Sequence, residues 1–428
     1  MSTSLFTPFT LSSGQTLRNR IAKAAMEEGM ASSGQIPDHR LIALYRRWGA
    51  GGAGLLITGN VMVHAHALTG PGGVVLDANS PLQPFTEWAA AGKSGGAAMW
   101  MQISHPGRQV SANMPGVVWG PSDVAVDLGK HSKRFGRPVA MSRKQIDATI
   151  ERFVTTAVRA EEAGFDGVEV HAAHGYLLSQ FLSPLVNQRI DEWGGSLENR
   201  ARLLLEMVRR IRLAVAPHFA VAVKLNSADF QRGGFDADDA LRVIAMLEPL
   251  GVDLVELSGG SYESPAMTGR PTDTRTAARE AYFLELAAEL AKTSPLPLML
   301  TGGITRQDTA NDVLANGVDI VGMGTAIAVT ADLPNRWREG REASEQLKPV
   351  TWSDKTLASA ASMALVRHQM RRITRGLAPT GRTHPLYALI NDQRIQRKAL
   401  ARYRKWLPTQ TPDLTSTHAA VTSLKDHR

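Results

Sequence analysis

The sequence predicts a parallel (β/α)8 TIM barrel followed by a basic, mostly helical C-terminal extension. Eight short apolar segments alternate with amphipathic stretches over about 320 residues, which is typical of a parallel sheet closed into a barrel. A doubly wound sheet is the alternative, but the first apolar segment lacks the glycine-rich fingerprint of a dinucleotide-binding fold. We therefore place a catalytic barrel in residues 1–345 and the extension in residues 346–428.

The predicted strands share a run of aliphatic residues bounded by turn residues. In chain order they are Ile21–Met26, Gly54–Thr58, Ala97–Ile103, Gly167–His171, Ala220–Leu225, Leu254–Ser258, Pro297–Thr301 and Ile320–Met323.

Between the strands, apolar residues recur at the spacing of one helix face. One helix centred on Phe153 should end near Gly164, because glycine is the preferred residue just after a helix. Another covers Leu197–Ile211. Asp236 and Thr305 precede apolar runs and are predicted N-caps, because their side chains can accept from free backbone N–H groups.

Composition indicates an ordinary globular protein, with 43% hydrophobic and 21% charged residues. The chain has no cysteine, which excludes disulfides, a thiol nucleophile, cysteine-ligated zinc and iron–sulfur clusters. Its start lacks a secretory signal pattern and no apolar run reaches membrane-spanning length, so we expect a soluble, cytoplasmic protein.

The net charge of +8 is concentrated near the C-terminus. Thr351–Arg428 holds 14 Lys or Arg against 4 Asp or Glu. A basic segment of this kind can bind nucleic acid or anionic lipid, but we favour a solvated helical face docked on the barrel. The final residues, Pro408–Arg428, are polar and predicted to be frayed.

The most informative segment begins at the end of the fourth predicted strand. His171, His174 and Tyr176 lie within six residues there. Side chains that leave a barrel strand at its carboxyl end point toward the mouth where barrels carry out chemistry. Two neutral imidazoles can donate to one carbonyl oxygen and a phenol can give up a proton. This pattern predicts chemistry on a polarised carbonyl compound.

Several segments together resemble the old yellow enzyme family, which are FMN-dependent NADH:flavin oxidoreductases and ene-reductases. The resemblance covers roughly residues 5–337, and its motifs occur in the family's order at predicted strand ends. The matching segments are Leu17–Ile21 with Ala24–Met26, Gln102–Gln109, His171–Pro184, Asp191–Arg200, Thr301–Ile304 and Val321–Thr325.

The resemblance implies roles for the three residues of the hexapeptide. His171 and His174 would bind the carbonyl oxygen of the substrate, and Tyr176 would protonate the α-carbon after hydride reaches the β-carbon. His105 and Arg108, in the Gln102–Gln109 segment, are interpreted as structural residues of the long loop that follows the third strand.

The resemblance also implies an FMN site. Its residues would be Ala25, Met26, Glu27 and Asn60 beside the N5–O4 edge of the ring, Gln102 and Lys224 beside the pyrimidine edge, and Gly303, Gly324 and Thr325 around the phosphate. Three of them depart from the commoner pattern. Lys224 and Thr325 stand where many relatives have Arg, and Glu27 stands where Thr or Cys is common. For Lys224 the alternative is a buried ion pair, and for Glu27 it is exposure to solvent or pairing with an arginine.

The expected function is transfer of hydride from NADH or NADPH, through FMN, to the C=C bond of an α,β-unsaturated carbonyl compound or similar activated alkene. One alternative is an enzyme similar to flavin-dependent tRNA dihydrouridine synthases, which would use the basic extension but protonate uridine from a cysteine that this chain lacks. Another is a flavin-binding protein with little turnover. We expect a small-molecule partner rather than nucleic acid, and no insertion into a membrane. A homo-oligomer is possible from the sequence.

Overall fold

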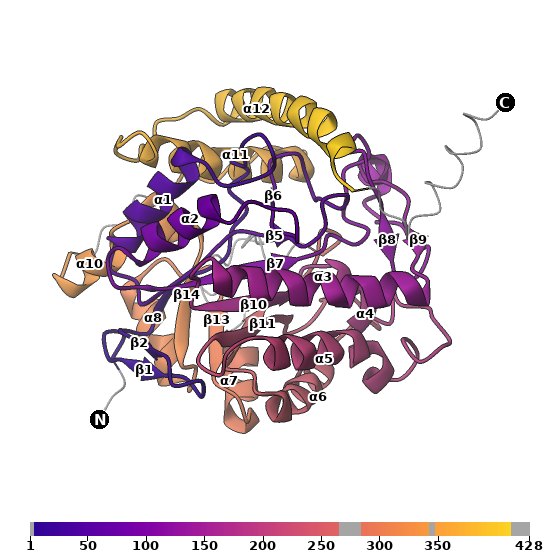
Figure 1. Cartoon of the computed structure of the whole chain (residues 1–428). Helices are drawn as coiled ribbons and strands as arrows, with labels where there is room; N and C mark the ends of the chain where they lie inside the picture. Colours follow the sequence, from indigo (N-terminus) through magenta and orange to yellow (C-terminus); the bar gives the residue numbers. More distant parts are fainter. Residues whose placement is uncertain (1–3, 265–283, 342–346, 412–428) are drawn as a thin grey trace.

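The computed structural model describes residues 4–264, 284–341 and 347–411. Eight parallel strands close into a barrel, because each pairs with the next and the last pairs with the first (Figure 1). They are β3 (Ile21–Lys23), β4 (Leu55–Ile57), β7 (Ala98–Ser104), β10 (Gly167–Ala172), β11 (Ala220–Asn226), β12 (Leu254–Ser258), β13 (Leu298–Thr301) and β14 (Ile320–Met323). The predicted (β/α)8 barrel is confirmed.

Helices surround the barrel and cover its outer face (Figure 1). They are α1 (His39–Gly49), α2 (Gln83–Lys93), α3 (Arg143–Glu162), α4 (Leu177–Leu182), α5 (Leu197–Ala214), α6 (Ala237–Leu247), α7 (Leu284–Thr293), α8 (Gln307–Ala315), α9 (Thr325–Val329) and α10 (Leu333–Arg338).

The predicted helix boundaries hold with one exception. Gly164 follows α3 with a φ of 84°, as a glycine after a helix should. The Asp236 side chain accepts from the backbone N–H of Asp239 and caps α6. Thr305 is not the cap of α8, because that helix begins at Gln307, one residue later than predicted, and Arg306 occupies the cap position.

Several short elements were not predicted from the sequence. A hairpin of β1 (Phe9–Thr10) and β2 (Thr16–Leu17) precedes the barrel, and β5 (Val61–Met62) pairs in parallel with both β7 and β6 (Val74–Val75). Within the long loop, β8 (Trp119–Gly120) pairs with β9 (Val139–Ala140). Three 3-10 helices, η1 (Gly129–Arg134), η2 (Glu248–Leu250) and η5 (Leu407–Thr409), complete the described elements.

Side chains on the inner face of the barrel form two kinds of layer. Near the amino ends of the strands an apolar cluster fills the barrel, and it includes Trp100, Ala222, Leu254 and Met299. Because successive strand residues point to opposite faces, the next inward position on each strand lies one step closer to the carboxyl ends. Those positions are polar and buried, being Gln102, Glu169, Lys224 and Glu256. The polar layer is the floor of the barrel mouth.

The C-terminal extension is two helices docked on the barrel. Helix α11 (Lys355–Ile373) contacts α1 and α9, and α12 (Pro385–Trp406) packs on α11 as the outermost helix (Figure 1). Met370 and Ile373 join the main hydrophobic cluster between the sheet and its helices. The Tyr403 hydroxyl donates to the carbonyl of Ala65 at 2.8 Å. The basic stretch, predicted to be a helical face docked on the barrel, is therefore part of the packed structure through residue 411. The predicted fraying of the last residues concerns positions beyond residue 411, which lie outside the described residues.

Among the described helices, none has the length and apolarity needed to cross a lipid bilayer.

Candidate active site

The His171–Tyr176 segment follows β10 at the carboxyl edge of the barrel. His171 is in register with Lys224 of β11, so its side chain faces the barrel mouth at the level of Lys224 and one inward step beyond Glu169. The ring centroids of His171 and His174 are 5.1 Å apart, and those of His171 and Tyr176 are 4.8 Å apart. The structure thus brings the three predicted catalytic side chains into one cluster.

The backbone turn at His174 creates this cluster. His174 has a φ of 61° and Gly175 a φ of 72°, so the chain reverses through two left-handed residues in succession. The turn is held by the His174 N–H, which donates to Asn226 Oδ1 at 3.0 Å, and by Gln109 Nε2, which donates to the His174 carbonyl at 2.9 Å. His174 Nε2 lies 2.7 Å from Ser258 Oγ. Neighbouring strand ends therefore fix both the backbone and the ring of His174.

Both imidazoles are neutral at neutral pH. Burial, together with the neighbouring His174 and Lys224, holds the pKa of His171 well below its usual value. Burial and Lys224 lower the pKa of His174 to about 3. A neutral imidazole carries one N–H, so each ring can donate one hydrogen bond. The site can therefore offer two donors to an oxygen without adding a full positive charge.

Tyr176 is held as a protonated phenol. Burial, the neighbouring Tyr262 and the carboxyl group of Glu27 raise the pKa of Tyr176 well above its usual value. Its hydroxyl lies 3.1 Å from that of Tyr262, which follows β12. Asn60, predicted beside a flavin edge, also neighbours the Tyr176 side chain and acts to lower its pKa. Tyr262 was missed from the sequence, because a lone tyrosine after a strand carries no motif.

Glu27 lies within the site and is not directed away into solvent. Its Oε1 accepts from the Thr69 hydroxyl at 3.1 Å. Burial raises the pKa of Glu27, while the guanidinium of Arg367 on α11 lowers it. Arg367 is itself paired with Asp392 of α12 at 2.6 Å. The positive charge that acts on Glu27 thus comes from the C-terminal extension, although the ion pair of Arg367 is with Asp392, and the Arg367 side chain also packs beside Gly29.

The polar floor contains two hydrogen-bonded pairs. Gln102 Nε2 donates to Glu169 Oε2 at 2.5 Å, and Lys224 Nζ lies 2.5 Å from Glu256 Oε1. All four side chains are buried. Lys224 therefore forms a buried ion pair, which was the alternative to a free charge beside a flavin. The glutamates were missed because each sits in an otherwise apolar strand.

The loops after β13 and β14 form a glycine-lined corner. Thr301 is in register with Gly322, so the two loops leave the barrel side by side. Gly303 has a φ of 67°, a conformation that costs other residues about 1–2 kcal/mol. Gly324 immediately precedes α9, and Thr325 is the first residue of that helix and exposed. The first N–H groups of a helix have no partner within it, so they remain available to an anion.

These features fit FMN. The corner offers backbone donors in a conformation that only glycine adopts readily, and the floor offers an amide and an ammonium group for the polar edge of a ring. Ala25 and Met26 follow β3, and the Met26 side chain lies next to Gly324, so the segment predicted to contact the ring adjoins the corner predicted to hold the phosphate.

His105 and Arg108 hold the long loop, the structural role predicted for them. His105 stacks on Trp119 with the rings 6° from parallel and 5.9 Å apart. Arg108 forms an ion pair with Glu263 at 2.5 Å and donates to the carbonyl of Ala125 at 2.8 Å. These contacts connect the loop after β7 to the segment after β12, and so they support the rim beside Tyr262.

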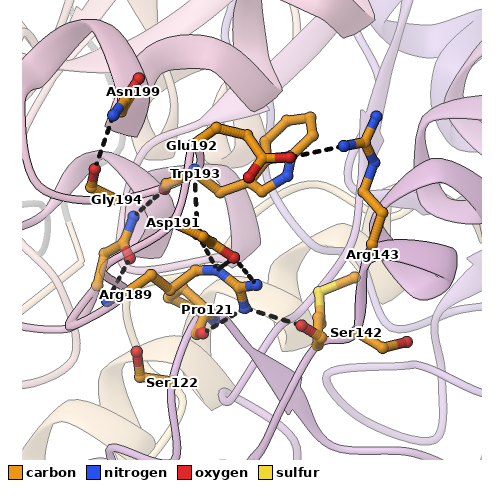
Figure 2. Close-up of polar contacts among 12 residues, drawn as sticks. Pro121, Ser122, Ser142, Arg143, Arg189, Asp191, Glu192, Trp193, Gly194 and Asn199 are labelled. Atoms are coloured by element: carbon orange, nitrogen blue, oxygen red, sulfur yellow. Dashed lines mark hydrogen bonds and ion pairs between the residues drawn. The ribbon is translucent and has the colours of Figure 1, made fainter.

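The Asp191–Arg200 motif is a structural clamp on the outer rim (Figure 2). Arg189 forms an ion pair with Asp191 and donates to the carbonyls of Pro121 at 3.0 Å and Met141 at 2.8 Å. Arg143 pairs with Glu192 at 2.6 Å. A shallow hollow of about 410 Å³ adjoins this clamp, and no predicted site residue lines it. The clamp joins the middle and the C-terminal end of the long loop to the segment before α5.

Comparisons with known proteins agree with this geometry. Residues 4–344 match the family described as the NADH:flavin oxidoreductase / NADH oxidase family. The NADH-dependent flavin oxidoreductase iliE of Hypocrea jecorina is 34% identical over 76% of this chain and 87% of its own. The NADPH dehydrogenase of Bacillus subtilis is 31% identical over 76% of this chain and 91% of its own.

Other relatives are longer than the matched region. For iliE of Neonectria sp., which is 36% identical over 76% of this chain, the match spans only 46% of the relative's length. A solved 2-naphthoyl-CoA reductase superposes with a TM-score of 0.72 at 28% identity, over 80% of this chain and 53% of its own. The old yellow enzyme homologue of Zymomonas mobilis superposes with a TM-score of 0.67 at 24% identity, over 80% of this chain and 95% of its own, and supports the fold. The chain belongs to the NADH:flavin oxidoreductase / NADH oxidase family, the FMN-dependent family of the old yellow enzymes.

Proposed function

We propose that the protein is an ene-reductase, which takes hydride from NADH or NADPH and reduces the C=C bond of an α,β-unsaturated carbonyl compound or similar activated alkene. The observation that carries the proposal is the cluster of two neutral imidazoles and one protonated phenol at the barrel mouth. FMN bound there supplies a group that accepts hydride from the nicotinamide and donates it to the alkene.

The imidazoles act on the substrate carbonyl. Negative charge moves onto the carbonyl oxygen as hydride adds to the β-carbon, and donors fixed in advance stabilise that charge. His174 is fixed by Asn226, Gln109 and Ser258, so its ring has little freedom to lose on binding. His171 and His174 therefore bind and polarise the carbonyl in one orientation, which places the α-carbon toward Tyr176.

Tyr176 acts as the general acid. A group that protonates carbon must hold its proton until the carbanion character develops, and the raised pKa of Tyr176 keeps the phenol protonated across the physiological range. Its hydroxyl contacts Tyr262 and Asn60, which orient the O–H bond. The proton leaves the Tyr176 hydroxyl oxygen and adds to the α-carbon.

The remaining predicted residues hold the cofactor. Gly303, Gly324 and Thr325 present backbone and hydroxyl donors to the phosphate, and Gln102 and Lys224 face the polar edge of the ring. Ala25, Met26 and Glu27 follow β3 beside the same mouth. In support, the family binds FMN, and the H. jecorina relative is named for NADH and the B. subtilis relative for NADPH.

Anaerobic titration tests the proposal. The purified protein should carry a yellow chromophore, which NADH or NADPH bleaches and which an enone, nitroalkene or maleimide then restores. Flavin that neither nucleotide bleaches would identify a flavin-binding protein without turnover. Protein that binds no flavin, even when FMN is added, would refute the proposal.

A further inference from the structure

Two glutamates lie inside the barrel, and neither has a part in the mechanism above. Glu169 of β10 and Glu256 of β12 have no exposed surface, and β11 separates their strands. We call these two residues the acid pair. An ionised carboxylate is costly to bury unless donors satisfy its oxygens. The hydrogen bonds around the acid pair therefore show how many charges it carries.

An amide and an ammonium group each satisfy one oxygen of a carboxyl group. Glu169 Oε2 accepts from Gln102 and Glu256 Oε1 accepts from Lys224. Glu169 Oε1 and Glu256 Oε2 are buried and have no hydrogen-bond partner among the residues that the structure describes. The two carboxyl groups nevertheless act on each other's pKa as hydrogen-bonding neighbours, and the Thr301 hydroxyl acts on that of Glu256 in the same way. Two ionised carboxylates can only accept, so a contact between them needs a proton.

We propose that the acid pair holds one proton, carried by Glu169, and that Glu256 is the permanent counter-charge of Lys224. Protonated Glu169 donates through Oε1 to Glu256 Oε2 while its Oε2 still accepts from Gln102. Every buried oxygen of the acid pair then has a partner. The floor carries one positive and one negative charge, and its net charge is zero.

The inference rests on the proposed placement of FMN against Gln102 and Lys224. It makes Glu169 and Glu256 positioning residues, which act on the flavin through those two side chains. Because the reduced flavin is an anion, its stability depends on the net charge beside it. The acid pair balances the ammonium of Lys224, and it thereby lowers the reduction potential below the value that an uncompensated lysine would give.

The environment of each carboxyl group agrees with this assignment. Burial and the neighbouring Glu256 raise the pKa of Glu169 well above its usual value. Burial opposes ionisation of Glu256 as well, but Lys224, Glu169 and the Thr301 hydroxyl together outweigh it, and the pKa of Glu256 is lowered. The other groups that face the acid pair from the surrounding strands are uncharged or separately paired: Gln102, Thr301, the neutral His171 and His174, and Lys23, which lies 3.7 Å from Glu28.

Infrared spectroscopy tests the proton directly and needs neither flavin nor turnover. At neutral pH the wild-type protein should show the C=O stretch of a protonated carboxylic acid, which shifts in D2O, and Glu169→Gln should remove it. Glu28→Gln is the matched control, since Glu28 is also buried but accepts from Tyr45 and from the Gly59 N–H. The band should persist in that variant. If the wild-type spectrum contains no band that Glu169→Gln removes, the proposal is overturned.

The midpoint potential of bound FMN tests the charge count. Glutamine has the shape and donor of a protonated glutamate, so Glu169→Gln should leave the potential unchanged. The double variant Glu169→Gln/Glu256→Gln leaves Lys224 uncompensated and should raise it. A rise in the single variant would mean that both carboxyl groups are ionised, and no rise in either variant would mean that both are protonated. Both results overturn the proposal.

The infrared and turnover measurements distinguish failure of the acid-pair assignment from failure of the proposed function. If the protein binds no FMN, the proposed function fails while the infrared result still decides whether the acid pair holds a proton. If FMN binds and turns over but the band is absent, the inference alone fails.

Discussion

Replacing Tyr176 by phenylalanine separates proton transfer from hydride transfer. The change removes one hydroxyl oxygen from a residue that is 6% exposed and leaves the ring against His171. General acids contribute roughly 10²–10⁴-fold to a rate, so alkene reduction should slow by that factor. Flavin reduction by the nicotinamide needs no proton from Tyr176, and its rate should stay within about twofold because no interaction made only in that step is lost.

Stopped-flow absorbance under anaerobic conditions measures the two steps separately. Bleaching of the flavin by NADH or NADPH follows the first step, and return of the yellow colour with an enone follows the second. The control is Tyr262→Phe, which removes the same 3.1 Å Tyr–Tyr hydrogen bond but keeps the Tyr176 hydroxyl. Losing that bond should cost about 0.5–1.5 kcal/mol of stability in either variant.

The expected result is a large loss in the second step for Tyr176→Phe and a small one for Tyr262→Phe. Equal losses of both steps in Tyr176→Phe would refute the role of Tyr176 as the acid. An equally large loss of alkene reduction in Tyr262→Phe would also refute it, because the proton would then depend on the pair rather than on Tyr176.

Three further predictions concern stability and cofactor binding. His174 has a pKa of about 3 in the folded state and an ordinary pKa in the unfolded state, so below about pH 6.5 the unfolded state binds an extra proton. The free energy of unfolding should therefore fall by up to about 1.4 kcal/mol for each pH unit below that value. His174→Asn, which tolerates the positive φ, should reduce this pH dependence in urea unfolding, and an unchanged dependence would contradict the assignment. Gly303→Ala should weaken FMN retention measured by filtration, whereas Gly14→Ala, at a similar positive φ but away from the site, should lose stability without losing FMN. Truncation after residue 346 removes Met370 and Ile373 from the core, so it should lower the melting temperature or leave the protein insoluble. A truncated protein that melts at the temperature of the full chain would show that the barrel does not need the extension.

The strand and helix pattern could be predicted because it depends on local periodicity. Seven of the predicted strands agree with the structure to within one residue at each end. The first predicted strand was too long. Ile21–Met26 is mostly apolar, but its pairing with the neighbouring strands extends only from Ile21 to Lys23. Beyond Lys23 the chain turns into the barrel mouth, where site residues rather than sheet pairing determine its path. The short strands β5 and β8 were missed because two residues carry no periodic signal.

The sequence by itself determined the barrel and the hexapeptide that we propose to be catalytic, because the alternation of strands and helices and the spacing of His171, His174 and Tyr176 are properties of adjacent residues. Only the tertiary structure decided which groups surround them. Tyr262, Glu256 and Arg367 lie far along the chain from the residues that they contact, and nothing in their local sequence marks those contacts. Both faces of a barrel strand are buried, so an apolar run cannot show which of its residues face the mouth. Closure of the sheet into a barrel determines which residues face the mouth, and it places Glu169 and Glu256 of two apolar strands in the floor of the site.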